Sequence, residues 1–168
     1  MERIRTILAP TDLSERSVEG VRYALNLAKA LGAEVTAYYV VPYHGFQNRQ
    51  RGEDETRPFE HASPYAESLL RRHQFALAHF LSTHFADLTP RVTIREKVEP
   101  GVPDKKIVDW AKKEASDLIV ISSHRIASVA EKAGQSVAEK VIRNAPCPVL
   151  FIRRVPDKEV VNEIGVNP

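Results

Sequence analysis

The sequence contains a single cysteine and a single tryptophan, and none of its apolar runs is long. Cys147 lies between two prolines and has no second cysteine to pair with, so we interpret it as a small buried residue. No window approaches the roughly 18 apolar residues that a membrane-spanning helix requires. The amino-terminal stretch is charged and then strand-like, without the apolar segment of a signal peptide, so we expect a cytoplasmic protein.

The sequence also lacks an excess of charge of either sign. It holds 24 lysines and arginines against 22 aspartates and glutamates, which gives a formal net charge of +2. This balance argues against a strongly basic surface that binds nucleic acid or an anionic membrane, and we expect neither partner. With 168 residues, 43% of them hydrophobic, the chain is long enough for one domain with a single core.

Short β-branched runs alternate with amphipathic segments along the chain. The runs predict strands at residues 4–9, 35–41, 91–98, 118–121 and 149–152. Apolar residues at three- and four-residue intervals predict helices at residues 18–31, 64–85, 103–115 and 136–144. Five strands alternating with four helices predict an α/β domain, a single doubly wound parallel sheet in strand order 3-2-1-4-5.

Two segments stand outside this alternation. Residues 43–63 hold few aliphatic side chains and many charges of both signs, so we interpret them as a mobile loop insertion, with a ligand lid as the alternative. Residues 155–168 form a weakly patterned C-terminal tail, which either frays or docks on a partner chain. The expected domain therefore covers residues 1–154.

Three histidines lie on the predicted second helix. His73, His79 and His84 could suggest a metal site, but no pair has the i,i+4 spacing and no cysteine or carboxylate completes a ligand set. We expect no metal and interpret them as surface histidines of the helix.

Polar residues follow the first and fourth predicted strands. Pro10 marks the end of the first strand and precedes Asp12, while Ser122, Ser123 and His124 follow the fourth. In the doubly wound order these strands are neighbours at the point where the sheet reverses, and the ligand crevice opens beyond their carboxyl ends. Asp12 can cap the first helix with one carboxylate oxygen and accept a ribose hydroxyl with the other.

The last predicted helix begins with a capping box. Ser136 is followed three residues later by Glu139, a pattern typical of a helix amino terminus. Such a terminus presents free backbone N–H groups and the positive end of the helix dipole, which suit a phosphate. We therefore predict a nucleotide- or anion-binding site between the fourth strand and this helix.

Five motifs, in this order and at these spacings, resemble the universal stress protein family of UspA-type domains. They are ILAPTDLSE, YYVV, VEPGVP, DLIVISSH and QSVAEKVIRNAPCPVLFIRR. The resemblance covers residues 4–153 and implies an adenine-nucleotide α-hydrolase-like fold. It also implies that Pro10, Asp12 and Val40 match the positions that hold the base and ribose in ATP-binding relatives.

ATP-binding members of that family carry a glycine pattern: glycine, two residues, glycine, nine residues, then glycine followed by serine or threonine. In this sequence the three glycine positions hold Ser122, Arg125 and Gln135, and only Ser136 agrees. Glycines let backbone N–H groups approach a phosphate, and the Arg125 side chain would occupy that space. Three outcomes stay open: an adenine nucleotide such as ATP, a small anion held by Arg125 and His124, or no nucleotide.

The resemblance implies a stress-response or signalling module without catalytic residues. The candidate site comprises Pro10, Asp12, Val40, Ser122, Ser123, His124, Arg125, Gln135, Ser136 and Val137. Relatives commonly form homodimers through the last strand, which here offers Val149, Leu150, Phe151 and Ile152. The alternatives are a sensor of ATP or another anion with weak phosphatase or ATPase activity, and a scaffold that has lost its ligand.

Overall fold

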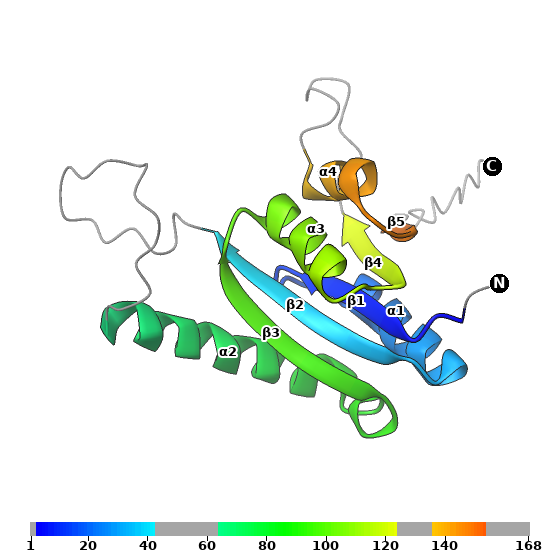
Figure 1. Cartoon of the computed structure of the whole chain (residues 1–168). Coiled ribbons are helices and arrows are strands. Elements are labelled where there is room, and N and C mark those ends of the chain that lie inside the picture. The colour runs from blue at the N-terminus through cyan, green and yellow to red at the C-terminus, as the bar shows by residue number, and fades with distance from the viewer. Residues whose placement is uncertain (1–2, 43–63, 124–135, 154–168) are drawn as a thin grey trace, which may run out of the picture.

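The computed structural model describes residues 3–42, 64–123 and 136–153 of the chain (Figure 1). Its strands are β1 (Thr6–Thr11), β2 (Glu34–Pro42), β3 (Thr93–Gly101), β4 (Leu118–Ser123) and β5 (Val149–Arg153). Its helices are α1 (Val18–Leu31), α2 (Pro64–Phe85), α3 (Pro103–Lys113) and α4 (Val137–Asn144), with a short 3-10 turn, η2 (Thr89–Arg91), before β3. All neighbouring strands are parallel, in the order β3-β2-β1-β4-β5. The predicted fold class and strand order are therefore confirmed.

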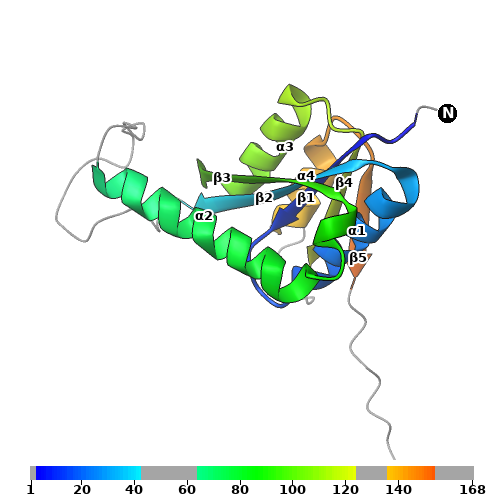
Figure 2. The same cartoon turned by 90° about the horizontal axis from the view of Figure 1, so that it is seen from below.

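The sheet is covered on both faces, as Figure 2 shows, with α1 and α2 on one side and α3 and α4 on the other. The pleat explains this, since successive residues of a strand point to opposite faces. In β1, for example, Ile7 and Ala9 join the core under α1 and α2, while Leu8 joins the core under α3 and α4. All three side chains are at most 1% exposed. The central strand therefore reads as a continuous apolar run because both of its faces are buried.

β1 and β4 are paired over only part of their length. The ladder between them joins Ile7 to Leu118 and Leu8 to Ile119, whereas β1 pairs with β2 from Thr6 to Thr11. β4 meanwhile stays paired with β5 as far as Ser123. The sheet therefore forks between β1 and β4 beyond Leu8, at the carboxyl ends of the strands.

The fork also corrects the prediction that β1 stops at Pro10. The strand continues to Thr11, with Pro10 opposite Tyr38 of β2. Proline cannot donate to a ladder. It is accommodated inside this strand because β4 is no longer paired with β1 at that level.

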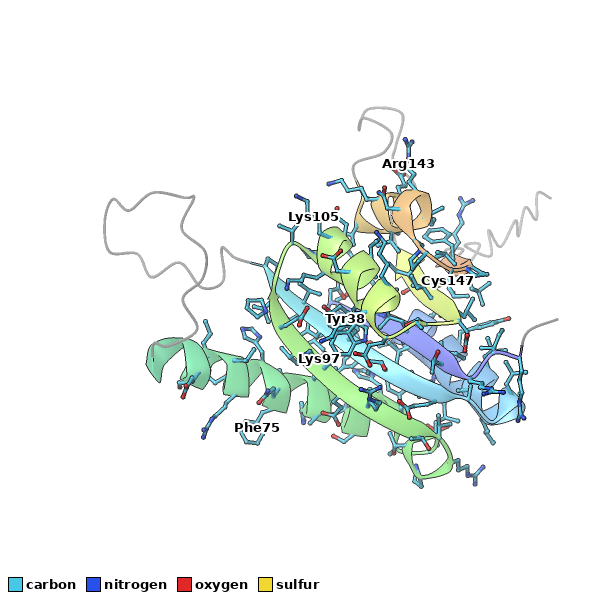
Figure 3. All side chains as sticks on the ribbon, viewed as in Figure 1. Tyr38, Phe75, Lys97, Lys105, Arg143 and Cys147 are labelled. Atoms are coloured by element: carbon cyan, nitrogen blue, oxygen red, sulfur yellow. The ribbon has the colours of Figure 1, made fainter. Side chains whose placement is uncertain are left out.

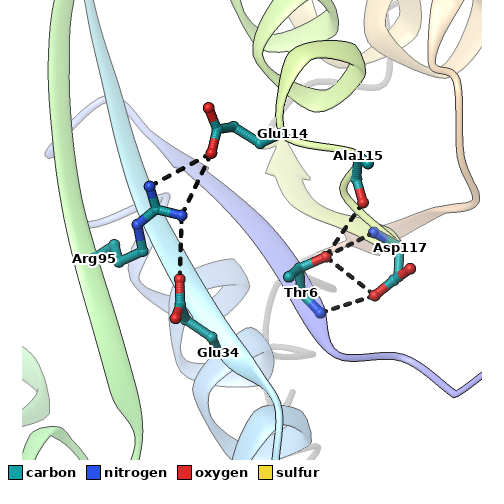
Figure 4. Close-up of polar contacts among 6 residues, drawn as sticks. All are labelled: Thr6, Glu34, Arg95, Glu114, Ala115 and Asp117. Atoms are coloured by element: carbon teal, nitrogen blue, oxygen red, sulfur yellow. Dashed lines mark hydrogen bonds and ion pairs between the residues drawn. The ribbon is translucent and has the colours of Figure 1, made fainter.

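At the opposite end of the sheet, Asp117 joins the starts of β1 and β4 (Figure 4). Its Oδ2 atom accepts hydrogen bonds from the backbone N–H of Arg5 (2.8 Å) and of Thr6 (2.9 Å) and from the Thr6 hydroxyl (3.1 Å). These donors favour the charged form, and the two backbone bonds in particular hold the pKa of Asp117 below its usual value. The carboxylate therefore fixes the register of the two central strands at their amino ends.

A second polar cluster lies beside it in Figure 4, on the exposed edge of the sheet. Arg95 of β3 contacts Glu34 of β2 at 3.3 Å and Glu114, just after α3, at 3.5 Å. Charged side chains on an edge strand discourage pairing with another sheet. The β3 edge is therefore protected by its charged side chains.

Several predicted boundaries move by a few residues. β3 begins at Thr93 rather than residue 91, because η2 precedes it, and runs on to Gly101. β4 extends through the two serines because it stays paired with β5. None of the helices within the described residues combines the length and the hydrophobicity that a membrane span requires. The predictions for residues 43–63 and 155–168 lie outside the described residues.

Candidate functional site

A cavity of about 430 Å³ opens at the fork between β1 and β4. Its walls come from the end of β1, the turn that leads into α1, the end of β2, the start of α3, the end of β4 and the start of α4. Its volume lies in the range of small-molecule sites, roughly 300 to 1,000 Å³. The cavity therefore occupies the place where open α/β sheets bind ligands.

The turn between β1 and α1 is held by buried hydroxyls. Thr11 and Ser17 share a hydrogen bond of 2.7 Å between their side-chain oxygens, and both residues are at most 7% exposed. Thr11 Oγ1 also accepts from the backbone N–H of Leu13 at 3.0 Å. Leu13 has a φ of +63°, a left-handed conformation that is uncommon for leucine, and this bond helps to keep it there. The turn is thus built to place Asp12 at the cavity.

Asp12 lines the cavity and uses one carboxylate oxygen locally. Its Oδ1 atom accepts from Ser14 at both the backbone N–H (3.0 Å) and the hydroxyl (2.6 Å). This differs from the predicted helix cap, because α1 begins only at Val18 and its N-cap, Ser17, makes no side-chain cap hydrogen bond. The second oxygen, Oδ2, has no hydrogen bond to any described residue, so it is available to a ligand hydroxyl.

The neighbouring Tyr39 interacts electrostatically with the carboxylate of Asp12. Burial raises the pKa of its hydroxyl, and the negative charge of Asp12 raises it further. On its other side the ring meets His73 of α2 edge to face, with ring centroids 5.5 Å apart. His73 is therefore half-buried against β2 rather than lying freely on the helix surface.

Ser122, at the first position of the glycine pattern, turns its side chain toward α1. Its hydroxyl donates to the backbone carbonyl of Arg16 at 3.2 Å. Gly20 faces it, and a Cβ atom added at Gly20 would lie 2.7 Å from Ser122 Oγ. The glycine in α1 therefore makes room for the serine, which stays in the cavity wall with its hydroxyl already bonded.

Tyr38 lines the cavity. Its side chain lies between the sheet and α3, as Figure 3 shows. Its hydroxyl donates to Glu99 Oε1 at 2.5 Å. The Glu99 carboxylate also forms ion pairs with Lys97, at 3.6 Å from Oε2 to Nζ, and with Lys106, at 3.5 Å from Oε1 to Nζ. The Tyr38 ring stacks on Trp110 with centroids 5.4 Å apart. Burial and the bond to Glu99 raise the pKa of Tyr38, so it remains a neutral, rigid wall element.

The amino terminus of α4 faces the cavity through Ser136, Val137 and Ala138. Ser136 Oγ accepts from the backbone N–H of Glu139 at 3.1 Å, which confirms the predicted cap. The first-turn N–H groups of a helix lack intrahelical partners and carry partial positive charge. The cavity lining therefore includes a donor-rich helix end as well as an acceptor, Asp12.

Six of the ten predicted site residues line this one cavity, although they come from four separate parts of the chain. They are Pro10, Asp12, Val40, Ser122, Ser136 and Val137. Ser123 ends β4, but its side chain is outside the described part of the molecule. His124, Arg125 and Gln135 lie outside the described residues as well, so their predicted roles stay predictions.

The structure adds residues that the sequence patterns did not single out for the site. The additional lining residues are Thr11, Arg16, Ser17, Tyr38, Tyr39, Pro42, Pro103, Ile107, Ile121 and Ala138. Most are apolar or aromatic strand and helix residues that periodicity identifies only as core. A signal existed for Arg16, which follows Asp12 by four residues, in the loop that the fold logic already placed at the crevice.

No group of three or more histidine, cysteine or acidic side chains that could hold a metal ion occurs within residues 3–42, 64–123 and 136–153. Cys147 is half-buried against the core under α3 and α4, and burial raises the pKa of its thiol. That environment agrees with the prediction of a structural rather than reactive cysteine.

Known proteins resemble this chain over nearly all of its length. It is 34% identical over 158 residues to a universal stress protein from Methanocaldococcus jannaschii, covering 92% of this chain and 85% of that protein. Among solved structures it resembles UspA from Lactobacillus plantarum, at 26% identity and a TM-score of 0.58, covering 91% of this chain and 100% of that one. A universal stress protein in complex with cAMP shares the fold at 18% identity and a TM-score of 0.59, covering 90% of this chain and 98% of that one.

A comparison of the sequence with protein families agrees with these similarities. The Universal stress protein family model matches residues 3–153, which include every described strand and helix. The sheet order and the four covering helices are those of the adenine-nucleotide α-hydrolase-like fold of these proteins. With its forked parallel sheet and the cavity beyond β1 and β4, the chain belongs to the universal stress protein family.

Proposed function

We propose that this universal stress protein is a cytoplasmic, homodimeric module that binds an adenine nucleotide and responds to it without enzymatic activity. The carrying observation is the cavity at the fork, where the carboxylate of Asp12 and the amino terminus of α4 line one space. A ribose hydroxyl can donate to Asp12 Oδ2, and phosphate oxygens can accept from helix N–H groups. The relative of the same fold in complex with cAMP supports an adenine nucleotide as the ligand.

The remaining walls suit a planar base. Val40 and Ile107 lie in the cavity wall together with Pro103, and these side chains offer an apolar surface that buries a ring away from water. Small-molecule sites combine such apolar walls with a few placed polar groups. The departures from the family's glycine pattern at Arg125 and Gln135 favour a shorter phosphate group over a triphosphate, because side chains there would occupy phosphate space.

The proposal of a non-enzymatic role rests on the composition of the cavity. Asp12 is the single carboxylate among its described lining residues. Phosphoryl transfer enzymes position metal ions and a nucleophile with several charged groups around the reacting phosphate. Asp12, a single carboxylate that is already hydrogen-bonded to Ser14, does not supply such a set of charged groups.

Mass spectrometry of the compounds released from the purified, denatured protein tests the nucleotide directly. We expect an adenine nucleotide, or a thermal shift of several degrees when AMP, cAMP, ADP or ATP is added at millimolar concentration. Trp110, the single tryptophan, stacks on the wall residue Tyr38, so its fluorescence offers a second readout of binding. The proposal is overturned if no nucleotide is released and no thermal shift is seen. Steady release of phosphate from ATP would overturn its non-enzymatic part.

A further inference from the structure

The cavity has two formally charged lining residues within the described part of the chain, and the proposed function uses only Asp12. The other is Arg16, which precedes α1 and has an exposed side chain. No ion pair between described residues engages its guanidinium. Asp12 and Arg16 thus present opposite charges to the same space without neutralising each other.

The backbone of Arg16 is anchored on both sides. Its carbonyl oxygen accepts from the Ser122 hydroxyl at 3.2 Å, which ties it to the end of β4. The next residue, Ser17, is buried and bonds to Thr11 of β1 at 2.7 Å and to the Ser14 carbonyl at 2.8 Å. Arg16 is therefore held between the two strands that form the fork, and only its side chain is free to meet a ligand.

Anionic groups match this arrangement better than any other ligand chemistry. A guanidinium presents several N–H donors in a planar fork that pairs with two oxygens of a phosphate or carboxylate. Apart from Asp12 and Arg16, the described lining is neutral, so no other described side chain of the cavity offers a full positive charge. The guanidinium of Arg16 and the positive end of the α4 helix dipole would both attract the same anion.

The position of Asp12 and Arg16 in the chain indicates which phosphate of a nucleotide Arg16 would bind. Asp12 and Arg16 belong to the same turn, four residues apart, at the same end of β1. Resting on the proposed function, we infer that Arg16 binds the phosphate attached directly to the ribose held by Asp12. Arg16 then makes the protein discriminate a nucleotide from its nucleoside, and it replaces part of the contact that a glycine-rich loop supplies in relatives.

Isothermal titration calorimetry of the full chain with AMP and with adenosine tests this inference. We expect wild type to bind AMP about 10- to 100-fold more tightly than adenosine, since hydrogen bonds between charged groups are worth that much. Arg16→Gln should weaken AMP binding about tenfold or more and leave adenosine affinity unchanged within about twofold. Arg91→Gln, which removes an exposed arginine before β3 at the far end of the sheet, is the matched control and should change neither affinity.

The outcomes separate the two proposals. If adenosine and AMP bind to wild type but Arg16→Gln changes both equally or neither, the role of Arg16 is overturned and the proposed function stands. If wild type binds neither compound, the role of Arg16 is overturned, and the proposed function is overturned with it only when cAMP, ADP and ATP also fail to bind. Should Arg16→Gln unfold, Arg16→Lys retains the charge without the planar fork, and an AMP preference identical to wild type would contradict bidentate recognition.

Discussion

A Cβ atom added at Gly20 of α1 would lie 2.7 Å from the Oγ atom and 2.9 Å from the Cβ atom of Ser122 in β4. Real Cβ atoms essentially never come that close to a nonbonded heavy atom, so any larger residue at position 20 must displace Ser122 or its strand. The missing side chain at position 20 explains how the Ser122 side chain is accommodated against α1. This close approach also couples α1, which follows Arg16, to the strand that ends at the cavity.

Substitution of Gly20 by alanine therefore sets two effects against each other. Alanine is favoured over glycine inside a helix by about 1 kcal/mol. Overpacking a tight contact costs about 1 to 3 kcal/mol. Because the contact is with a backbone-anchored serine, we expect Gly20→Ala to lower the free energy of unfolding by up to about 2 kcal/mol in urea denaturation.

A double-mutant cycle assigns that loss to Ser122. In the Ser122→Gly background the Oγ and Cβ atoms are gone and only the backbone N, 3.0 Å from the added Cβ, stays close. Gly20→Ala should then be nearly neutral. Additivity of the two changes within about 0.5 kcal/mol would show that the strain lies elsewhere.

Asp12→Asn should remove the preference of the site for an intact ribose. The amide keeps the Oδ1 acceptor that bonds Ser14, so the turn stays folded, but it replaces the charged Oδ2 by an NH₂ group that cannot accept. We expect wild type to bind adenosine about tenfold more tightly than 2′,3′-dideoxyadenosine, and the variant to bind both alike. An unchanged ratio in calorimetry would remove Asp12 from the ligand contact.

Asp117→Ala should destabilise the sheet in a pH-dependent way. The bonds from Arg5 and Thr6 lower the pKa of this carboxyl in the folded protein, so its contribution is present above the unfolded value, near pH 4, and is lost as pH falls through the lower folded value. Since the side chain is partly exposed, we expect a loss of about 1 kcal/mol at pH 7. The difference from wild type should shrink below about pH 4.

The control for that experiment is Asp109→Ala, which removes an exposed carboxylate from α3. Its effect on unfolding should stay within about 0.5 kcal/mol. A difference between Asp117→Ala and wild type that is constant from pH 7 to pH 3 would contradict the role of the charged form.

Phe151→Lys should weaken the proposed homodimer. β5 is an edge strand, and Val149, Leu150, Phe151 and Ile152 are only half-buried within one chain. Their side chains alternate between the two cores, so a second chain added at this edge would cover what remains exposed. We expect wild type to sediment as a dimer and the variant to dissociate at about tenfold higher concentration or more.

Phe75→Lys provides the matched control for dimerisation. Phe75 is 76% exposed on α2, far from β5, as Figure 3 shows, and its replacement makes the same chemical change. Sedimentation of this variant should equal that of wild type. Dissociation by Phe75→Lys but not by Phe151→Lys would place the interface on α2 instead.

The prediction of the fold succeeded because each element carries its own signal. The 18–31 helix shows apolar residues at helical spacing and stops at Gly32, which indeed adopts the left-handed conformation with φ of +65°. Ser136 caps α4 as its spacing to Glu139 predicts. Two local expectations were wrong: β1 continues through Pro10, because it stays paired with β2 there, and Asp12 bonds Ser14 rather than capping α1, whose N-cap is Ser17.

The candidate site was predictable only in outline. The rule that ligands bind beyond the carboxyl ends at a sheet reversal brought Asp12 and Ser122 together from positions more than 100 residues apart. It did not show that the Ser122 hydroxyl bonds the Arg16 carbonyl, because a hydrogen bond between residues 106 positions apart has no local pattern. Arg16 was not among the predicted site residues either, although its place four residues after Asp12 put it in the loop at the crevice.

The order of strands and helices, the two-faced core and the location of the crevice follow from the amino-acid sequence alone, because periodicity and caps are properties of neighbouring residues. The fork beyond Leu8, the fit of Ser122 against Gly20 and the entry of Arg16 into the cavity wall were decided by tertiary structure. These depend on distances between segments remote in the chain, and such distances are set only when the helices pack onto the finished sheet.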